Sequence, residues 1–262
     1  MPIEPLNLTQ RLAGRVAVIT GGSGGIGFAT AKRFAAEGAK VVIGDLDPAV
    51  GEAAAASIDG LFVKADVTDK DQVDALFDTA AATYGSVDIA FNNAGISPPD
   101  DDSIETTELA AWDRVQLVNL TSVYLCSRAA LRHMVPAGRG SIINTASFVA
   151  VLGSATSQIS YTASKGGVLA LSRELGVQFA RQGIRVNALC PGPVNTPLLK
   201  ELFAKDPERA ARRLIHVPVG RFAEPEELAA AVAFLASDDA SFITASTFLV
   251  DGGISAAYVT PL

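Results

Sequence analysis

The 262-residue sequence has few positive charges and no long apolar run. Its 21 lysines and arginines are outnumbered by 28 aspartates and glutamates, which leaves a formal net charge of −7. A general nucleic-acid binder needs a basic face, so this balance argues against that class. No stretch of about 18 uncharged apolar residues suggests a membrane span, and the first residues lack the pattern of a secretory signal. We expect a cytoplasmic protein with no nucleic-acid or membrane partner.

Cysteine and histidine are also sparse, with two of each. Cys126 and Cys190 lie in apolar segments and show neither metal-ligand spacing nor a disulfide framework, so we expect two buried thiols and no metal. His133 and His216 lack an aspartate or serine partner at a strand end, and we expect both to be structural.

Short β-branched runs alternate with longer alanine-rich segments of helical period, a pattern typical of βαβ units around a parallel sheet. The runs are nearly continuous in apolar residues, which indicates a sheet covered by helices on both faces. We predict an α/β fold in one domain over residues 1–262. Seven strands are expected at 15–20, 40–44, 60–65, 87–92, 140–146, 184–190 and 246–252.

Between these runs, residues 69–85 show the spacing of an amphipathic helix. Thr68 is the expected cap, with Asp71 closing a capping box. The expected buried stripe follows the i, i+3, i+4, i+7 pattern and consists of Val73, Leu76, Phe77 and Ala80.

Only residues 91–108 and 191–227 are long and irregular enough to be functional loops or lids.

A glycine-rich turn follows the first predicted strand. Glycines there let backbone N–H groups approach a pyrophosphate, and the start of the next helix adds a positive dipole end. We therefore expect a dinucleotide on this turn, which contains Gly21, Gly22, Gly24, Gly25 and Gly27.

Asp45 ends the second predicted strand, 20 residues after Gly25. A carboxylate in that place accepts hydrogen bonds from both adenosine ribose hydroxyls and repels a 2′-phosphate. Neither the glycine turn nor Leu46 supplies a cation to neutralise such a phosphate, so we predict NAD rather than NADP.

Tyr161 and Lys165 are one helical turn apart in the segment SYTASK. Hydride transfer between an alcohol and a carbonyl needs a group that moves a proton at the oxygen, but a phenol titrates only near 10. A cation about 4 Å away contributes roughly 4 kcal/mol at an effective dielectric of about 20, more than the ~1.4 kcal/mol per pKa unit. Lys165 can therefore lower the pKa of the Tyr161 phenol enough for it to act as the proton-transfer group. Ser147 ends a predicted strand nearby and can hydrogen-bond the substrate oxygen, with Thr145 as an alternative donor.

Together, these motifs resemble the classical short-chain dehydrogenase/reductase family over essentially the whole chain. They are TGGSGGIG at 20–27, NNAG at 92–95, Ser147 with YTASK, PGPVNTP at 191–197 and VDGG at 250–253. The resemblance implies a Rossmann-like, doubly wound sheet of seven parallel strands, a nicotinamide cofactor and a homotetramer formed partly through the helices after NNAG and SYTASK. One departure is that residues 148–160 place 13 residues between the serine and the tyrosine, where the family most often has 12.

The resemblance also implies individual roles. Asn119 would bend its helix and hold a water that connects Lys165 to solvent, and Lys165 would also hold the nicotinamide ribose. Asp66 would bind the adenine amine, and a substrate lid would cover about 193–220. The implied catalytic residues are Asn119, Ser147, Tyr161 and Lys165. The implied cofactor-binding residues are Gly21, Ser23, Gly24, Gly25, Ile26, Gly27, Asp45, Asp66, Val67, Asn93, Ala94, Gly95, Tyr161, Lys165, Pro191, Gly192, Val194 and Thr196.

The leading hypothesis is an NAD-dependent oxidoreductase that interconverts a small secondary alcohol and a ketone, with Tyr161 as general base or acid. Two alternatives stay open. An NADPH-using 3-oxoacyl-thioester reductase is disfavoured by Asp45 and Leu46, and a non-catalytic nucleotide-binding sensor is disfavoured by the set of Ser147, Tyr161 and Lys165. The sequence does not identify the substrate.

Overall fold

The computed structural model describes residues 10–154, 156–196, 199, 208 and 214–257. Seven parallel strands form one sheet in the order β3-β2-β1-β4-β5-β6-β7. This confirms the predicted fold class and the position of every predicted strand. The strands are β1 (Val16–Thr20), β2 (Lys40–Asp45), β3 (Leu61–Lys64), β4 (Ile89–Asn92), β5 (Gly140–Thr145), β6 (Ile184–Pro191) and β7 (Thr247–Val250).

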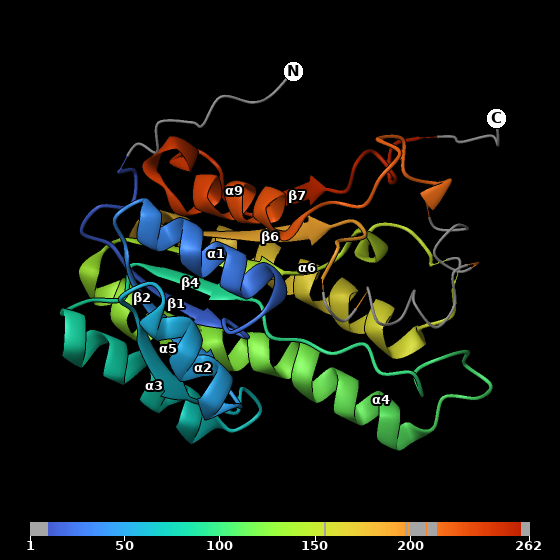
Figure 1. Ribbon diagram of the computed structural model, residues 1–262, viewed down its shortest axis with the longest axis horizontal. Coiled ribbons are helices and arrows are strands. Elements are labelled where there is room, and N and C mark those ends of the chain that lie inside the picture. Colours follow the sequence, from blue (N-terminus) through green and yellow to red (C-terminus); the bar gives the residue numbers. More distant parts are fainter. Residues whose placement is uncertain (1–9, 155, 197–198, 200–207, 209–213, 258–262) are drawn as a thin grey trace.

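Helices cover both faces of this sheet (Figure 1). α1 packs against α9 on one side, and α3 packs against α5 on the other. In the described part of the chain, no helix has the length and apolarity needed to cross a membrane. The helices are α1 (Gly25–Ala36), α2 (Pro48–Ala56), α3 (Lys70–Tyr84), α4 (Leu109–Gln116), α5 (Ser122–Ala137), α6 (Ile159–Phe179) and α9 (Pro225–Ala236).

Each face of the sheet has its own apolar core, because side chains alternate along a strand. In β1, Ala17 and Ile19 join the core beneath α1 and α9, whereas Val16 and Val18 join the core beneath α3 and α5. Burying a side chain of valine or isoleucine size stabilises a fold by about 1.5–3 kcal/mol. These two cores hold the strands in register and so position the strand ends.

The start of α3 differs from the prediction. Asp69, not Thr68, is the N-cap, and its Oδ1 accepts the N–H groups of Asp71 at 2.9 Å and Gln72 at 3.2 Å. The Thr68 hydroxyl instead donates to Asp66 at 2.7 Å. The predicted apolar stripe is confirmed, since its four side chains are fully buried.

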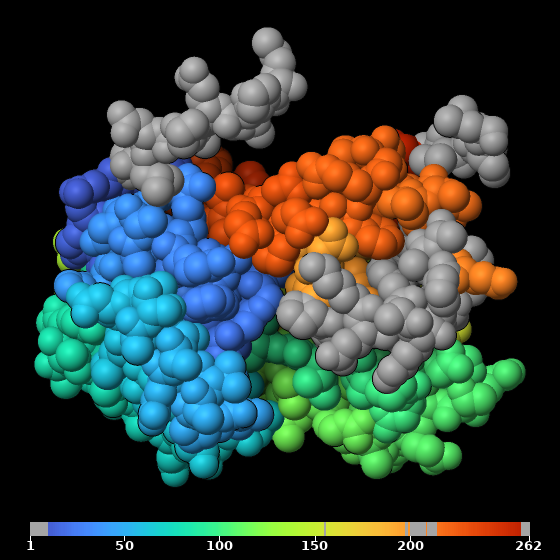
Figure 2. All heavy atoms as spheres, in the orientation of Figure 1, coloured from blue at the N-terminus to red at the C-terminus, as the bar shows by residue number. Residues whose placement is uncertain are grey.

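The carboxyl ends of all seven strands meet at one edge of the sheet. The chain order reverses between β1 and β4, and ligands of doubly wound sheets bind at such a switch point. The space-filling view shows a hollow between the blue surface of the first βα units and the green and orange surface of later segments (Figure 2).

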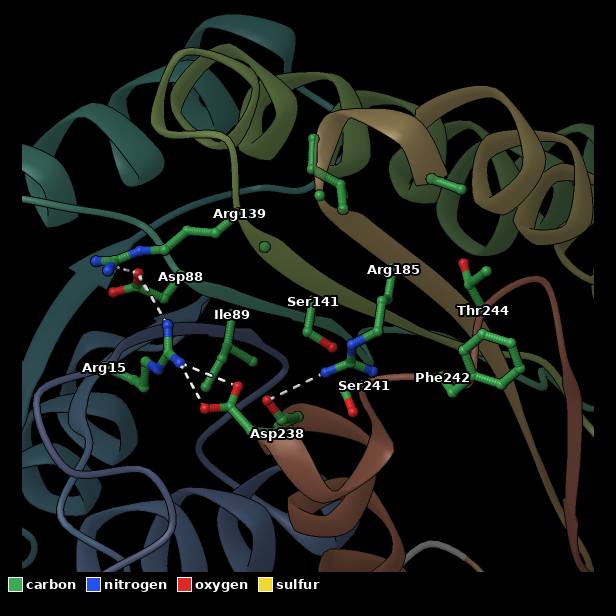
Figure 3. Close-up of a pocket in the computed structure, with 15 residues that line it drawn as sticks. Arg15, Asp88, Ile89, Arg139, Ser141, Arg185, Asp238, Ser241, Phe242 and Thr244 are labelled. Carbon is green, nitrogen blue, oxygen red and sulfur yellow. Dashed lines mark hydrogen bonds and ion pairs between the residues drawn. The ribbon is translucent and has the colours of Figure 1, made fainter.

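The opposite, amino-terminal edge is closed by ion pairs around a cavity of about 600 Å³ (Figure 3). Asp88 contacts Arg15 at 4.0 Å and Arg139 at 2.8 Å, and Arg15 also pairs with Asp238 at 3.0 Å. Arg185 donates to the last carbonyls of α9, including Leu235 O at 2.7 Å. The charges at this edge are paired with one another or with a helix end, which is a structural role.

Candidate active site

The glycine loop joins β1 to α1 and depends on glycine at three places. Gly21 and Gly25 have φ angles of +61° and +50°, in the left-handed region that favours glycine. A Cβ atom on Gly27 would lie 2.0 Å from the Gly21 carbonyl oxygen, so the first turn of α1 packs directly on the loop. Gly24, the N-cap, carries no side chain over the helix start. The loop presents bare backbone and a positive helix end, which fits a pyrophosphate.

Asp45 lies at the end of β2, beside this loop. The backbone N–H of Ser23 donates to Asp45 Oδ2 at 3.1 Å, and the Ser23 hydroxyl donates to the same oxygen. The N–H of Leu46 donates to the other carboxylate oxygen at 2.8 Å. Past β3, one oxygen of Asp66 accepts the N–H two residues on, and Val67 is buried next to it. A carboxylate held against the glycine loop fits the ribose of a dinucleotide.

The segment after β6 reaches the glycine loop from the other side. The Thr196 Cγ2 atom lies 3.4 Å from where a Cβ on Gly25 would stand. A Cβ on Gly192 would lie 2.7 Å from the backbone that follows β7, so close packing requires glycine there. Pro191 is the last residue of β6, and Val194 forms an isolated bridge to the segment before α9. Much of the predicted lid at 193–220 lies outside the described residues.

The end of β4 ties the central strands to the glycine loop. Asn92 donates to Asn144 of β5 at 2.8 Å and so braces the central strands. The Asn93 side chain donates to the Gly21 carbonyl at 3.1 Å, and Ala94 Cα lies 3.0 Å from where a Gly21 Cβ would stand. The structure therefore gives the Asn93 side chain a role in shaping the loop.

Lys165 is a buried cation at the centre of the site. Its side chain is 3% exposed, and its Nζ donates to the Thr145 carbonyl at 2.7 Å. The same Nζ lies 5.6 Å from the centre of the Tyr161 ring. Burial lowers the pKa of the Lys165 ammonium to about 8. The group is therefore charged at neutral pH and loses its charge under mildly alkaline conditions.

Asn119 lies in a π-helical turn, Leu117–Thr121, between α4 and α5. Such turns are frequent at functional sites. Its side chain forms a pair of hydrogen bonds with Ile96, accepting the N–H and donating to the carbonyl, both at 2.8 Å. A Cβ on Gly95 would lie 3.2 Å from Asn119 Oδ1 and 3.5 Å from Lys165 Nζ. Gly95 therefore lets Asn119 and Lys165 approach the same point.

Ser147 follows β5 and is 5% exposed. Its hydroxyl accepts the N–H of Val149 at 3.4 Å. Burial raises the pKa of Cys190 to about 11, so this residue is a thiol at neutral pH. The hydroxyl oxygen of Thr145, the alternative donor, is enclosed. Both cysteines are buried, as predicted.

Sequence reasoning missed three residues that organise the site. The Thr20 hydroxyl accepts the N–H of Asn93 at 3.1 Å, and the Ser164 hydroxyl accepts from Asn119 at 3.3 Å. Asp101 accepts hydrogen bonds from the first turn of α6. The position of Thr20 directly before the glycine turn is a weak sequence signal for its contact with Asn93. The other two involve partners 45 and about 60 positions away, which local pattern does not reveal.

Comparison with known proteins supports the family resemblance that the sequence motifs indicate. A family model described as Enoyl-(Acyl carrier protein) reductase matches residues 21–255. The cis-4-hydroxycyclohexanecarboxylate dehydrogenase of Sinomonas cyclohexanicum is 47% identical, with 94% of this chain and 99% of that protein covered. The 2,5-dichloro-2,5-cyclohexadiene-1,4-diol dehydrogenase of Sphingobium indicum is 38% identical, with 95% and 99% covered. The crystal structure of levodione reductase superposes with a TM-score of 0.89 at 39% identity, covering 95% of this chain and all of that one.

The family model runs from the glycine loop to the segment beyond β7, and the named relatives are dehydrogenases and reductases, of which levodione reductase has the same fold as this chain. The chain belongs to the classical short-chain dehydrogenase/reductase family.

Proposed function

We propose that this oxidoreductase interconverts a secondary alcohol and a ketone on a six-membered carbon ring, with NAD as cofactor. The main observation in support of this reaction is that the buried Lys165 Nζ lies 5.6 Å from the centre of the Tyr161 ring. The six-membered carbon ring of the substrate is supported by two relatives whose names specify hydroxylated cyclohexane and cyclohexadiene substrates.

In this proposal Tyr161 removes the hydroxyl proton during alcohol oxidation and returns it during ketone reduction. A neighbouring cation favours the ionised form of a phenol, so Lys165 prepares Tyr161 as the base. Ser147 donates a hydrogen bond to the substrate oxygen, since the competing Thr145 hydroxyl is enclosed. A bound nicotinamide supplies the hydride acceptor or donor. Lys165 passes the proton towards solvent through a water beside Asn119, a step supported by the approach of both side chains to Gly95.

The preference for NAD rests on Asp45. The carboxylate is fixed against the glycine loop by Ser23, where it would repel a 2′-phosphate. The exposed Leu46 beside it offers no positive charge. An NADP preference would need a cation to neutralise the 2′-phosphate, and Lys64 is the register partner of Asp45 in β3.

The alternative is an NADPH-dependent 3-oxoacyl-thioester reductase. The acyl-carrier-protein substrate in the description of the matching family supports it. The cofactor separates the two functions, because the alternative requires a 2′-phosphate next to Asp45.

A substrate panel tests the proposal. Cyclohexanols with polar substituents, linear secondary alcohols and a 3-oxoacyl thioester are offered with each of the four nicotinamide cofactors, and the absorbance of the reduced cofactor is followed. We expect the highest kcat/KM with a cyclohexanol and NAD⁺. A clear preference for the thioester with NADPH would contradict both the substrate class and the ribose argument.

We further propose a homotetramer that forms partly through α5 and α6. A groove of about 470 Å³ between these helices supports it. Its walls include the apolar side chains of Leu131, Val135, Leu175 and Phe179. Sedimentation equilibrium measures the assembly, and a monomer at micromolar concentration would contradict the proposal.

A further inference from the structure

The loop from Gly95 to Glu108, between β4 and α4, contains a buried carboxylate that the mechanism above does not use. Asp101 is 5% exposed, although it lies in the acidic run Asp100, Asp101, Asp102. Burying a carboxylate is costly unless it is paired or hydrogen-bonded. Its partners therefore indicate why it is buried.

Those partners are the first N–H groups of α6, the helix that carries Tyr161. Asp101 Oδ1 accepts the N–H of Ser160, and Asp101 Oδ2 accepts the N–H of Tyr161, both at 2.8 Å. The carbonyl of Asp102 accepts the N–H of Ile159 at 3.1 Å. The first N–H groups of a helix have no acceptor within the helix. Two consecutive loop residues thus supply the acceptors for the first turn of α6.

The same loop is fixed at its other end by Asn119. The two hydrogen bonds between Asn119 and Ile96 hold the beginning of the loop beside Lys165. The loop is therefore a brace between two proposed site residues, Asn119 at one end and Tyr161 at the other. A negative charge at a helix N-terminus is also favourable, which strengthens the second attachment.

We propose that Asp101 is a positioning residue for Tyr161. This inference rests on the proposed function, in which Tyr161 moves the proton. Because Asp101 binds the backbone N–H of Tyr161 itself, it sets where the phenol stands relative to Lys165 and Ser147. Proton and hydride transfer tolerate little displacement of the reacting groups, so loss of this attachment lowers kcat.

Two substitutions of Asp101, together with one substitution of its neighbour Asp102, test the positioning role. Asp101→Ala removes both acceptors, whereas Asp101→Asn keeps one acceptor oxygen and the shape of the side chain. Asp102→Asn is the matched control, because it removes a charge from the adjacent, exposed position while its backbone carbonyl still binds Ile159. For each variant, kcat and KM are measured with the best alcohol of the panel. NADH-binding stoichiometry from fluorescence titration gives kcat per competent site.

We expect kcat per site to fall about 10- to 100-fold in Asp101→Ala and roughly 3- to 10-fold in Asp101→Asn, with KM values within about twofold. Asp102→Asn should match the wild type. A purely structural role would reduce the number of competent sites and leave kcat per site unchanged, and that result would overturn the proposal. If Asp101→Ala does not fold, the kcat of Asp101→Asn decides in the same way.

Tyr161→Phe, measured alongside, separates the two proposals. Wild-type turnover in Tyr161→Phe would contradict the proposed function. An inactive Tyr161→Phe together with a normal kcat per site in the Asp101 variants would contradict only the positioning role.

Discussion

Replacing Lys165 with methionine should abolish turnover and yet raise the stability of the fold. The ammonium is buried and its pKa is lowered from 10.5 to about 8. At pH 7 it is charged in both the folded and the unfolded chain, and the difference in pKa corresponds to about 3 kcal/mol of lost stability. Methionine avoids this penalty but leaves the Thr145 carbonyl without its donor, which costs about 1–2 kcal/mol. We expect a net gain of about 1–2 kcal/mol in unfolding free energy at pH 7.

The pH dependence of stability is the sharper readout. Between pH 8 and 10.5 the unfolded chain binds more protons at Lys165 than the folded chain does, so the wild type becomes more stable as pH rises. Relative to Lys165→Met, the wild type should gain about 2 kcal/mol between pH 7 and pH 9.5. Urea unfolding of both proteins at a series of pH values measures this difference. Lys40→Met, at an exposed lysine, controls for the change of net charge.

Parallel stability curves for the wild type and Lys165→Met across this pH range would refute the reasoning. They would mean that Lys165 is solvated or paired with an anion, and that burial does not depress its pKa. Its role in preparing Tyr161 at neutral pH would then need another physical cause.

Two further variants, one of them a double substitution, test the proposed cofactor site. Asp45→Ala combined with Leu46→Arg should shift the preference at least tenfold towards NADP, measured as the ratio of kcat/KM values; an unchanged ratio would remove Asp45 from the ribose argument. Gly27→Ala should lower the unfolding free energy by several kcal/mol and abolish NADH binding, because its Cβ would lie 2.0 Å from the Gly21 carbonyl. The control Gly166→Ala, in a helix interior with open space around the new methyl group, should not lower stability. Normal NADH binding by Gly27→Ala would contradict the close packing of α1 on the loop.

The strands and the amphipathic helix α3 could be predicted because their signals are local. Apolar runs of strand length alternate with helical spacing, and Val73 and Leu76 are fully buried as that spacing requires. The α3 cap was predicted wrongly because two adjacent residues, Thr68 and Asp69, can each act as a cap: the Thr68 hydroxyl binds Asp66, and Asp69 accepts the first N–H groups of the helix.

The geometry of the site could be predicted only in part. Motifs identify Asp45 and Lys165, but not the contacts that fix them, which join segments far apart in the chain. Asp101 shows this most clearly, since its acidic neighbours suggest a solvated turn, whereas the fold buries it against a helix 60 positions further on. The sequence likewise does not reveal that Asn93 shapes the glycine loop.

The most direct test of the central claim is the turnover of Tyr161→Phe with NADH binding measured on the same sample. The substitution removes one hydroxyl and leaves the ring beside Lys165. We expect NADH to bind within about threefold of the wild-type affinity, and kcat to fall by at least about 10³-fold because the hydroxyl group proposed to move the proton is removed. Substantial turnover by a variant that binds NADH normally would contradict the account.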